Sequence, residues 1–128
     1  MTIAATELAG IQHLQARYGH LVDAADWDGL RACFTDDAVL DLSSYGMDTL
    51  RGIDAVMRFY TDVDHPAAHH LTNVDPWRDG ATVRCRTKWM TTQVDGRAAG
   101  GDYVDVLVAG LGGWRIQERV VVPRWRQA

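Results

Sequence analysis

The sequence is poor in the features that define several large classes of protein. Its 128 residues include only two cysteines and three prolines, and Cys33 and Cys85 stand far apart without a CxxC partner. This argues against a disulfide scaffold, and we expect two buried thiols in a reducing cytoplasm. No run approaches the roughly 18 apolar residues of a membrane span. The first ten residues lack the basic and then apolar pattern of a secretory signal. We therefore predict a cytoplasmic protein that has no membrane partner.

Charge of one sign and the common binding motifs are also scarce. The formal net charge is −4, so no global basic field would attract nucleic acid. The chain has no glycine-rich phosphate loop and no Gly-x-Ser-x-Gly elbow. Neighbouring side chains of a strand diverge, so His69 and His70 cannot both reach one metal ion, and His65 lies in a loop without a known ligand spacing. We expect no nucleic-acid partner, no cofactor and no metal.

What is present fits a single domain over residues 1–128, because domains most often have roughly 100–150 residues. Apolar residues recur at three- and four-residue spacing over 11–25, which predicts a first helix. A short second helix is expected up to Phe34, followed by a strand over 38–42 and a third helix over 53–60.

The second half of the chain is typical of antiparallel strands joined by tight turns. Alternating residues and turn signals predict strands over 68–74, 82–93, 101–109 and 114–122. Asp75-Pro76 is expected to close the first of these and Pro123 to limit the last. Helices followed by a meander of strands indicate an α+β fold, with helices packed on one face of a curved antiparallel sheet.

The most informative segment is His69-His70-Leu71-Thr72-Asn73, which places two histidines at the start of a predicted strand. Strand alternation sends one of them inward with Leu71 and Asn73, and the other outward. An inward imidazole is a candidate proton-transfer group, because its ordinary pKa lies near neutrality. A strand-end histidine that only hydrogen-bonds to backbone explains the pattern about as well.

An acid/base histidine needs an orienting carboxylate, and a second proton donor would help it. Tyr18 lies on the apolar stripe of the first helix, where a core tyrosine is the alternative reading. Asp23 falls off that stripe, on the side of the polar residues, so periodicity alone calls it a surface acid. The alternative carboxylates on predicted strands are Asp41, Asp102 and Asp105.

Two further groups of side chains stand out in the second half. Arg84, Arg86 and Lys88 share one face of a strand, which predicts a solvated face or a dimer surface. Trp89 shares the opposite face with apolar residues, so we expect it in the core or the wall of a pocket. Trp125 is a candidate for a subunit contact.

The order of several short motifs resembles a known family. The motifs are the run from Ile11 to Ala38, then Leu50-Arg51-Gly52, His69 to Asn73, Gly101-Asp102-Tyr103 and Gly113-Trp114-Arg115-Ile116. They span about residues 7–120 and resemble the SnoaL-like proteins of the nuclear-transport-factor-2-like superfamily, which includes ketosteroid isomerase and scytalone dehydratase. The resemblance implies a cone-shaped α+β barrel whose three helices and strongly curved sheet enclose an apolar pocket. It also implies a homodimer.

In the dehydratase branch of that superfamily, an aspartate of the first helix pairs with a histidine ahead of a Thr/Ser-Asn pair. Asp23 and His69 match those positions, and Tyr18 matches a tyrosine found five residues before the aspartate in dehydratase relatives. The resemblance therefore supports Asp23 against the helical periodicity. It also favours His69 over His70, because His69 shares strand parity with Asn73. The dehydrochlorinase of this branch has lysine where Tyr18 stands, which argues against halide elimination.

These observations lead to two hypotheses about function. The first is a cofactor-independent lyase or isomerase, of the dehydratase or cyclase type, acting on a hydrophobic ring-bearing small molecule such as a polyketide or steroid-like metabolite. His69 would take a proton, Asp23 would orient it and Tyr18 would polarise a substrate oxygen. The second is a non-catalytic binding or assembly module of the same fold; hydration in the same cavity is a weaker third reading. The expected pocket residues are Phe34, Tyr45, Met57, His70, Asn73 and Trp89.

Overall fold

The computed structural model describes residues 2–128, whose three helices and five longer strands follow the predicted order. A 3-10 turn over 43–45 and a two-residue strand over 50–51 lie where the sequence predicts a loop. The elements are α1 (Ala5–Asp23), α2 (Trp27–Arg31), β1 (Phe34–Asp41), the 3-10 turn η1 (Ser43–Tyr45), β2 (Leu50–Arg51), α3 (Ile53–Asp62), β3 (Ala68–Asp79), β4 (Thr82–Thr92), β5 (Ala98–Gly110) and β6 (Gly113–Arg126). The fold is α+β, as predicted.

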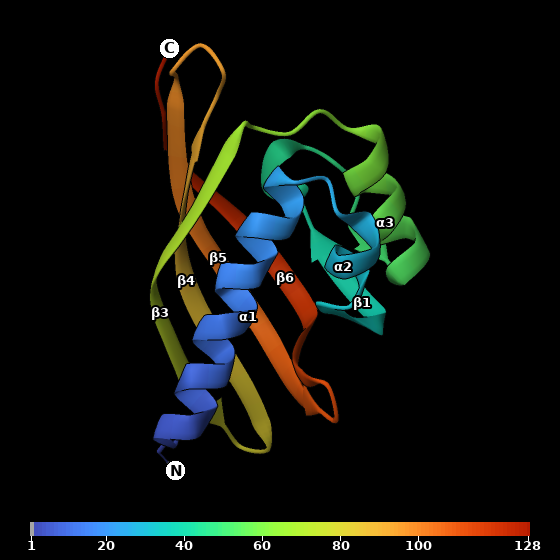
Figure 1. Ribbon diagram of the computed structural model, residues 1–128, viewed down its shortest axis with the longest axis vertical. Helices are drawn as coiled ribbons and strands as arrows, with labels where there is room; N and C mark the ends of the chain where they lie inside the picture. The colour runs from blue at the N-terminus through green and yellow to red at the C-terminus, as the bar shows by residue number, and fades with distance from the viewer. Residues whose placement is uncertain (1) are drawn as a thin grey trace.

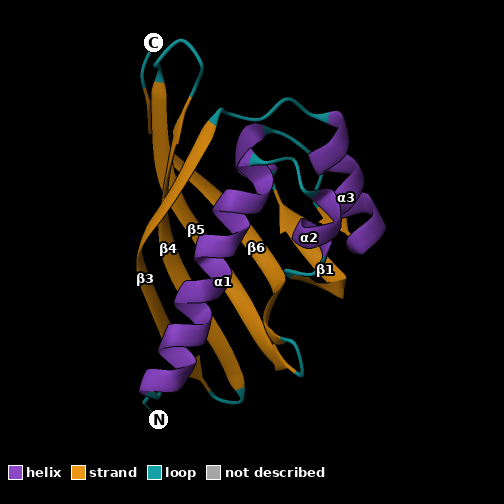
Figure 2. Cartoon of the chain, viewed as in Figure 1, coloured by secondary structure: helices purple, strands orange, loops and turns teal. Residues whose placement is uncertain are grey.

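The strands form one sheet in the order β2-β1-β6-β5-β4-β3. Strands β3 to β6 are an antiparallel meander, and α1 lies across their inner face (Figure 1). The helices gather on one side of the sheet, where α2 and α3 lie beside β1 (Figure 2). The sheet is mixed and not purely antiparallel as expected, because β1 pairs with β6 in parallel. The chain reaches β6 only after the whole meander, so the direction in which β6 arrives is set by four intervening strands.

The apolar stripe of α1 forms one side of the core. Ile11, Leu14, Tyr18 and Val22 recur at three- and four-residue spacing, and all four are buried against the sheet. Strand β4 supplies the opposite side, with each inward residue buried and each outward neighbour more exposed. Both helical and strand periodicities therefore identify the core correctly. Cys33 and Cys85 are buried free thiols, as expected.

Several element boundaries differ from the predictions. Phe34 begins β1 instead of ending α2, which stops at Arg31. Strand β3 continues past Pro76 to Asp79, since it lies at the edge of the sheet, where a missing backbone N–H costs little. Strand β6 likewise runs through Pro123, which sits at a register shift opposite Gly101.

Candidate active site

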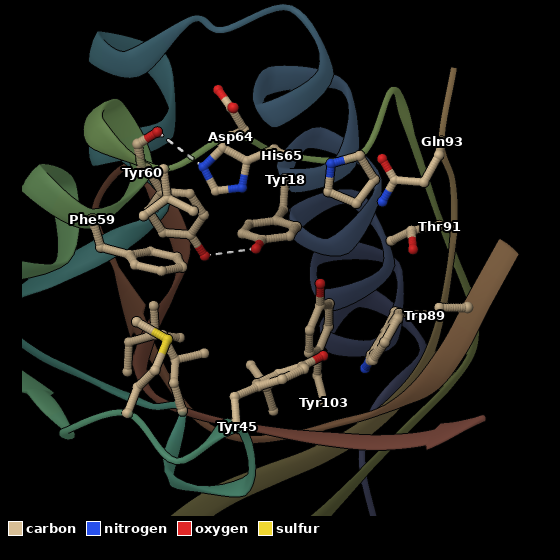
Figure 3. Close-up of a pocket in the computed structure, with 17 residues that line it drawn as sticks. Tyr18, Tyr45, Phe59, Tyr60, Asp64, His65, Trp89, Thr91, Gln93 and Tyr103 are labelled. Carbon is tan, nitrogen blue, oxygen red and sulfur yellow. Dashed lines mark hydrogen bonds between the residues drawn. The ribbon is translucent and has the colours of Figure 1, made fainter. Parts of the chain in front are cut away.

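A cavity of about 370 Å³ lies between the helices and the inner face of the sheet. Figure 3 shows its wall as a ring of aromatic side chains from separate elements. These are Tyr18, Tyr45, Phe59, Tyr60, Trp89 and Tyr103. The polar lining comes from Asp64, His65, Thr91 and Gln93. Around the mouth, Tyr45, Met47 and Val63 are partly exposed. An apolar cavity with a few polar groups is the usual form of a small-molecule site.

Tyrosine hydroxyls form the polar centre of this cavity. The Tyr18 and Tyr60 oxygens lie 2.6 Å apart, so one hydroxyl donates to the other. The Tyr18 and Tyr103 rings meet edge to face, with centroids 5.7 Å apart. Burial raises the pKa of Tyr60 and of Tyr103 well above the ordinary value. These two hydroxyls therefore stay protonated at neutral pH, which keeps them available as hydrogen-bond donors.

A fully buried arginine lies directly behind the tyrosines. The guanidinium carbon of Arg119 is 4.3 Å from the centroid of the Tyr18 ring and 4.0 Å from that of Tyr103. Its positive charge offsets only part of the effect of burial, so the pKa of Tyr103 stays raised. Arg119, ion-paired with Asp105, therefore places its guanidinium against two tyrosine rings that line the cavity.

Arg119 is held by a buried polar network. Its Nε and Nη2 both donate to the Asp105 carboxylate at 2.9 Å, and Nη2 also donates to Gln15 Oε1 at 2.6 Å. Gln15 in turn donates to Asp105 at 2.9 Å. Burial opposes the charge, but Asp105 outweighs it and raises the Arg119 pKa. Only Nη1 lacks a hydrogen-bond partner among the buried side-chain atoms of residues 2–128.

The structure brings Asp23 and His69 together at the end of α1. His69 Nδ1 donates to Asp23 Oδ1 at 2.7 Å, and the His69 backbone N–H donates to Oδ2 at 3.0 Å. The carboxylate thus fixes both the ring and the backbone of His69. With the proton on Nδ1, Nε2 of the neutral ring has a lone pair, and this nitrogen has no hydrogen-bond partner within residues 2–128. A neutral imidazole oriented in this way by a carboxylate is chemically able to accept a proton.

Local sequence explains why these two residues can meet. Asp23 is the last residue of α1, where the stripe of the helix ends and the side chain can turn toward the sheet. One turn earlier, Gly19 lies against β3: a Cβ there would come within 3.3 Å of the His69 carbonyl oxygen. The missing side chain lets β3 approach the helix closely. Asp23 is an exposed residue at the surface, as the helical periodicity predicts, and its side chain, 28% exposed, still reaches His69.

His69 lies beside the cavity but is not one of its lining residues. Its side chain is 6% exposed, on the inner face of β3, and its partner across the ladder is Thr91, which lines the cavity. The ring turns toward α1 to meet Asp23, and both residues line a separate hollow between α1 and β3. His65 lines the aromatic cavity itself. From the sequence, His65 was considered only as a metal ligand, and a poor one.

The other expected pocket residues divide into three groups. Tyr45 and Trp89 line the cavity, as does Tyr18. Phe34 and Met57 are buried in the core but lie outside the lining. His70 and Asn73, also expected in the pocket, do not line it and are exposed. His70 opens instead onto a surface hollow on the outer face of the sheet, with Lys88 and Trp125.

A β-bulge explains the misplacement of Asn73. The register of β3 against β4 shifts between Thr72 and Asp75, and Asn73 has a φ of +55°. An extra residue in a strand breaks the simple alternation of faces. Parity with Asn73 was therefore a wrong reason to prefer His69, although His69 and Leu71 do share the inner face. Asparagine tolerates the left-handed region better than most residues, and that was the signal available in the sequence.

Residues that sequence reasoning missed are Tyr60, Tyr103, His65 and Arg119. Tyr60 follows the apolar pattern of α3 and Tyr103 alternates within β5, so both read as core. Arg119 follows two polar residues and precedes a run of valines, and no local pattern indicates that it is fully buried. Only the pairing of Asp105 with Arg119 across β5 and β6 would have identified it.

The remaining predictions concern surfaces and metals. Arg84 pairs with Asp79 at 2.9 Å and Lys88 with Asp102 at 2.9 Å, whereas Arg86 forms no ion pair with any residue from 2 to 128. In the same range, no three histidine, cysteine or acidic side chains are grouped so that they could hold a metal ion. No helix of the described chain is long and apolar enough to span a membrane. The homodimer and the cytoplasmic location stay predictions.

An α+β cone with helices on the inner face of a curved sheet, and a cavity between them, defines the nuclear-transport-factor-2-like class of folds. Within it, the chain belongs to the SnoaL-like family, whose domain matches residues 4–120. No curated protein matches the sequence.

Solved structures share this fold across nearly the whole chain. A Novosphingobium aromaticivorans protein, provisionally assigned as an aromatic ring hydroxylase, is 29% identical, with a TM-score of 0.81 over 97% of this chain and 93% of its own. A Mycobacterium tuberculosis protein of unknown function is 26% identical, with a TM-score of 0.74 over 93% of this chain and 72% of its own. A second N. aromaticivorans protein, provisionally assigned as a scytalone dehydratase, is similar in fold alone. It is 18% identical, with a TM-score of 0.77 over 95% of this chain and 87% of its own.

Proposed function

We propose that this protein is a cofactor-independent lyase or isomerase that moves a proton next to a carbonyl group of a hydrophobic ring compound. The observation that carries the proposal is the Asp23–His69 hydrogen bond, which orients an imidazole on the inner face of β3, across the ladder from Thr91 of the cavity wall. The 29% identical relative is provisionally assigned to act on an aromatic ring, which agrees with a ring-shaped ligand here.

The proposed reaction needs a base on one side of the ligand and hydrogen-bond donors on the other. His69 Nε2 would accept the proton beside Thr91, while Asp23 stabilises the imidazolium that forms. On the facing wall, the hydroxyl pair of Tyr18 and Tyr60 would donate to the substrate oxygen as it gains charge. The proton held by His69 then returns to a second carbon, which gives an isomerase, or to a departing hydroxyl, which gives a dehydratase.

The proposal is tested by exchange of the α-hydrogens of 1-tetralone in D2O, followed by proton NMR. This ring ketone has the proton and the oxygen that the two walls would engage, and it needs no departing group. We expect the wild-type chain to accelerate exchange, and His69→Ala to lower the enzymatic rate by about 10²–10⁴-fold. Asp23→Asn should lower it too, since the imidazole loses the group that orients it.

The matched control is His13→Ala, because His13 is an exposed histidine of α1 outside the cavity. Its exchange rate should equal that of the wild type. Exchange at the buffer rate with wild-type protein would contradict the proposal, and so would a His69→Ala variant as fast as the wild type. The same fold would then serve as a binding module.

A further inference from the structure

A second histidine, outside the proposed acid/base pair, faces the cavity. His65 lies in the connection between α3 and β3 and lines the cavity together with Asp64. Its ring stacks on Tyr60 at a centroid distance of 5.4 Å and an interplanar angle of 25°. It also meets the Phe59 ring edge to face at 5.7 Å. Pro66 follows directly and favours an extended backbone at His65. The imidazole is therefore fixed in one orientation in the wall.

The hydrogen bonding of His65 determines which of its nitrogens is free. Nε2 lies 2.9 Å from the backbone carbonyl oxygen of Tyr60. A carbonyl only accepts, so Nε2 carries the proton and donates it, and in the neutral ring Nδ1 keeps a lone pair. Nδ1 has no hydrogen-bond partner within residues 2–128. Figure 3 shows this second nitrogen on the edge of the ring turned away from the Tyr60 carbonyl, on the side of Tyr18.

The surroundings keep this imidazole neutral. Burial lowers the pKa of His65 and outweighs the hydrogen bond to the Tyr60 carbonyl, which raises it. A neutral imidazole at pH 7 offers an acceptor at Nδ1, whereas the tyrosine hydroxyls of the same cavity can donate. The cavity therefore presents a hydrogen-bond acceptor and hydrogen-bond donors at separate places.

We propose that His65 is a specificity-determining residue whose Nδ1 accepts a hydrogen bond from a hydroxyl group on the ligand. The favoured ligand is then a hydroxylated ring compound: one oxygen meets the tyrosine hydroxyls and a separate hydroxyl meets His65. Ring ligands that lack the hydroxyl, or carry it as a methyl ether, bind less tightly because Nδ1 loses its water without gaining a partner. The inference rests on the proposed function only in taking this cavity as the ligand site.

The test compares two probes by calorimetry at pH 7.5: 2-naphthol and 2-methoxynaphthalene, which differ in whether the oxygen can donate. The wild-type chain should prefer the naphthol by about five- to tenfold, the size of one net hydrogen bond. His65→Phe keeps an aromatic ring against Tyr60 but has no acceptor, so its ratio should fall to about one while the ether still binds. His65→Gln has an amide oxygen and should regain part of the preference.

Two controls separate this inference from folding defects and from the proposed function. His13→Phe changes an exposed histidine of α1 and should keep the wild-type ratio. The two probes measure binding alone, so a chain without turnover can still show the preference. In 15N NMR of the wild-type protein, naphthol but not the ether should shift the Nδ1 resonance of His65, a result that needs no variant.

An unchanged ratio in a folded His65→Phe variant would overturn the proposal. Equal binding of the two probes by the wild type would overturn it as well, and so would failure of both probes to bind, because the cavity would then not take such rings.

Discussion

At the scale of single residues, the site depends on charges that are buried and paired. Arg119 is wholly buried, yet it makes three hydrogen bonds to Asp105 and Gln15 and lies against two phenol rings. A buried ion pair adds little net stability over apolar residues of the same volume, because both charges lose their water. Its effect in this structure is positional, since the pair holds Arg119 against the rings of Tyr18 and Tyr103.

The first prediction at this scale concerns removal of that arginine. Arg119→Met leaves the Asp105 carboxylate buried without a cationic partner, so the free energy of unfolding should fall by about 3–5 kcal/mol. Urea denaturation followed by tryptophan fluorescence measures the change. The matched comparison is Arg31→Met in the exposed Arg31–Asp54 pair, which should cost less than about 1 kcal/mol. Similar losses for the two variants would show that burial of the pair does not decide its importance.

At the scale of elements, close approaches decide how the sheet curves around the cavity. Strand β5 passes β6 and the Trp89 ring at Gly101, where a Cβ would lie 2.1 Å from the Val122 carbonyl oxygen and 2.9 Å from Trp89. The register of β5 against β6 also shifts at this point. A residue without a side chain permits a bend here that brings the Trp89 wall to the cavity.

Gly101→Ala should therefore destabilise the fold by at least about 1–3 kcal/mol, because neither the backbone oxygen nor the packed indole can move freely. Thermal unfolding followed by circular dichroism gives the change in midpoint. Gly112→Ala is the control, since its Cβ would have no atom within 4 Å and its φ is not positive. It should stay within about 0.5 kcal/mol of the wild type. A midpoint for Gly101→Ala equal to that of Gly112→Ala would disprove the close-packing argument.

At the scale of the whole molecule, carboxylates on the sheet tie stability to pH. On the outer face, Asp102 accepts hydrogen bonds from Lys88 at 2.9 Å and Arg124 at 2.5 Å. Burial would raise its pKa, but these two cations outweigh burial and lower it below the ordinary 3.8. The unfolded chain then binds a proton more readily than the folded one. The stabilisation is present above about pH 5 and is lost as the pH falls through 3.8 toward the lower folded value.

Asp102→Asn should accordingly be less stable than the wild type at pH 7 and lose less stability between pH 5 and pH 3. Urea unfolding at pH 7, 5 and 3 compares the two slopes. Asp54→Asn is a suitable control, since its carboxylate is mostly exposed, and its slope should match the wild type. Parallel slopes for wild type and Asp102→Asn would show that Asp102 is not a source of acid sensitivity.

Much of the architecture could be predicted because it depends on local periodicity. The stripe from Ile11 to Val22 and the alternation of β4 identify the core, since each face of an element meets either water or protein. The parallel pairing of β1 with β6 could not be predicted, because it depends on where four later strands place the end of the sheet. Asn73 was misplaced for a related reason, as one bulge changes the face of every residue beyond it.

The sequence by itself determined the α+β class, the order of the elements, the buried thiols and a short list that included Tyr18, Asp23 and His69. Only the tertiary structure decided that Asp23 reaches His69, that Arg119 lies behind the tyrosines and that His65 faces the cavity. Periodicity predicts the average environment of an element. It does not predict the contacts of the last residue of a helix, the position of a bulge or a buried ion pair. These are contacts between segments far apart in the sequence, which exist only once the chain has folded.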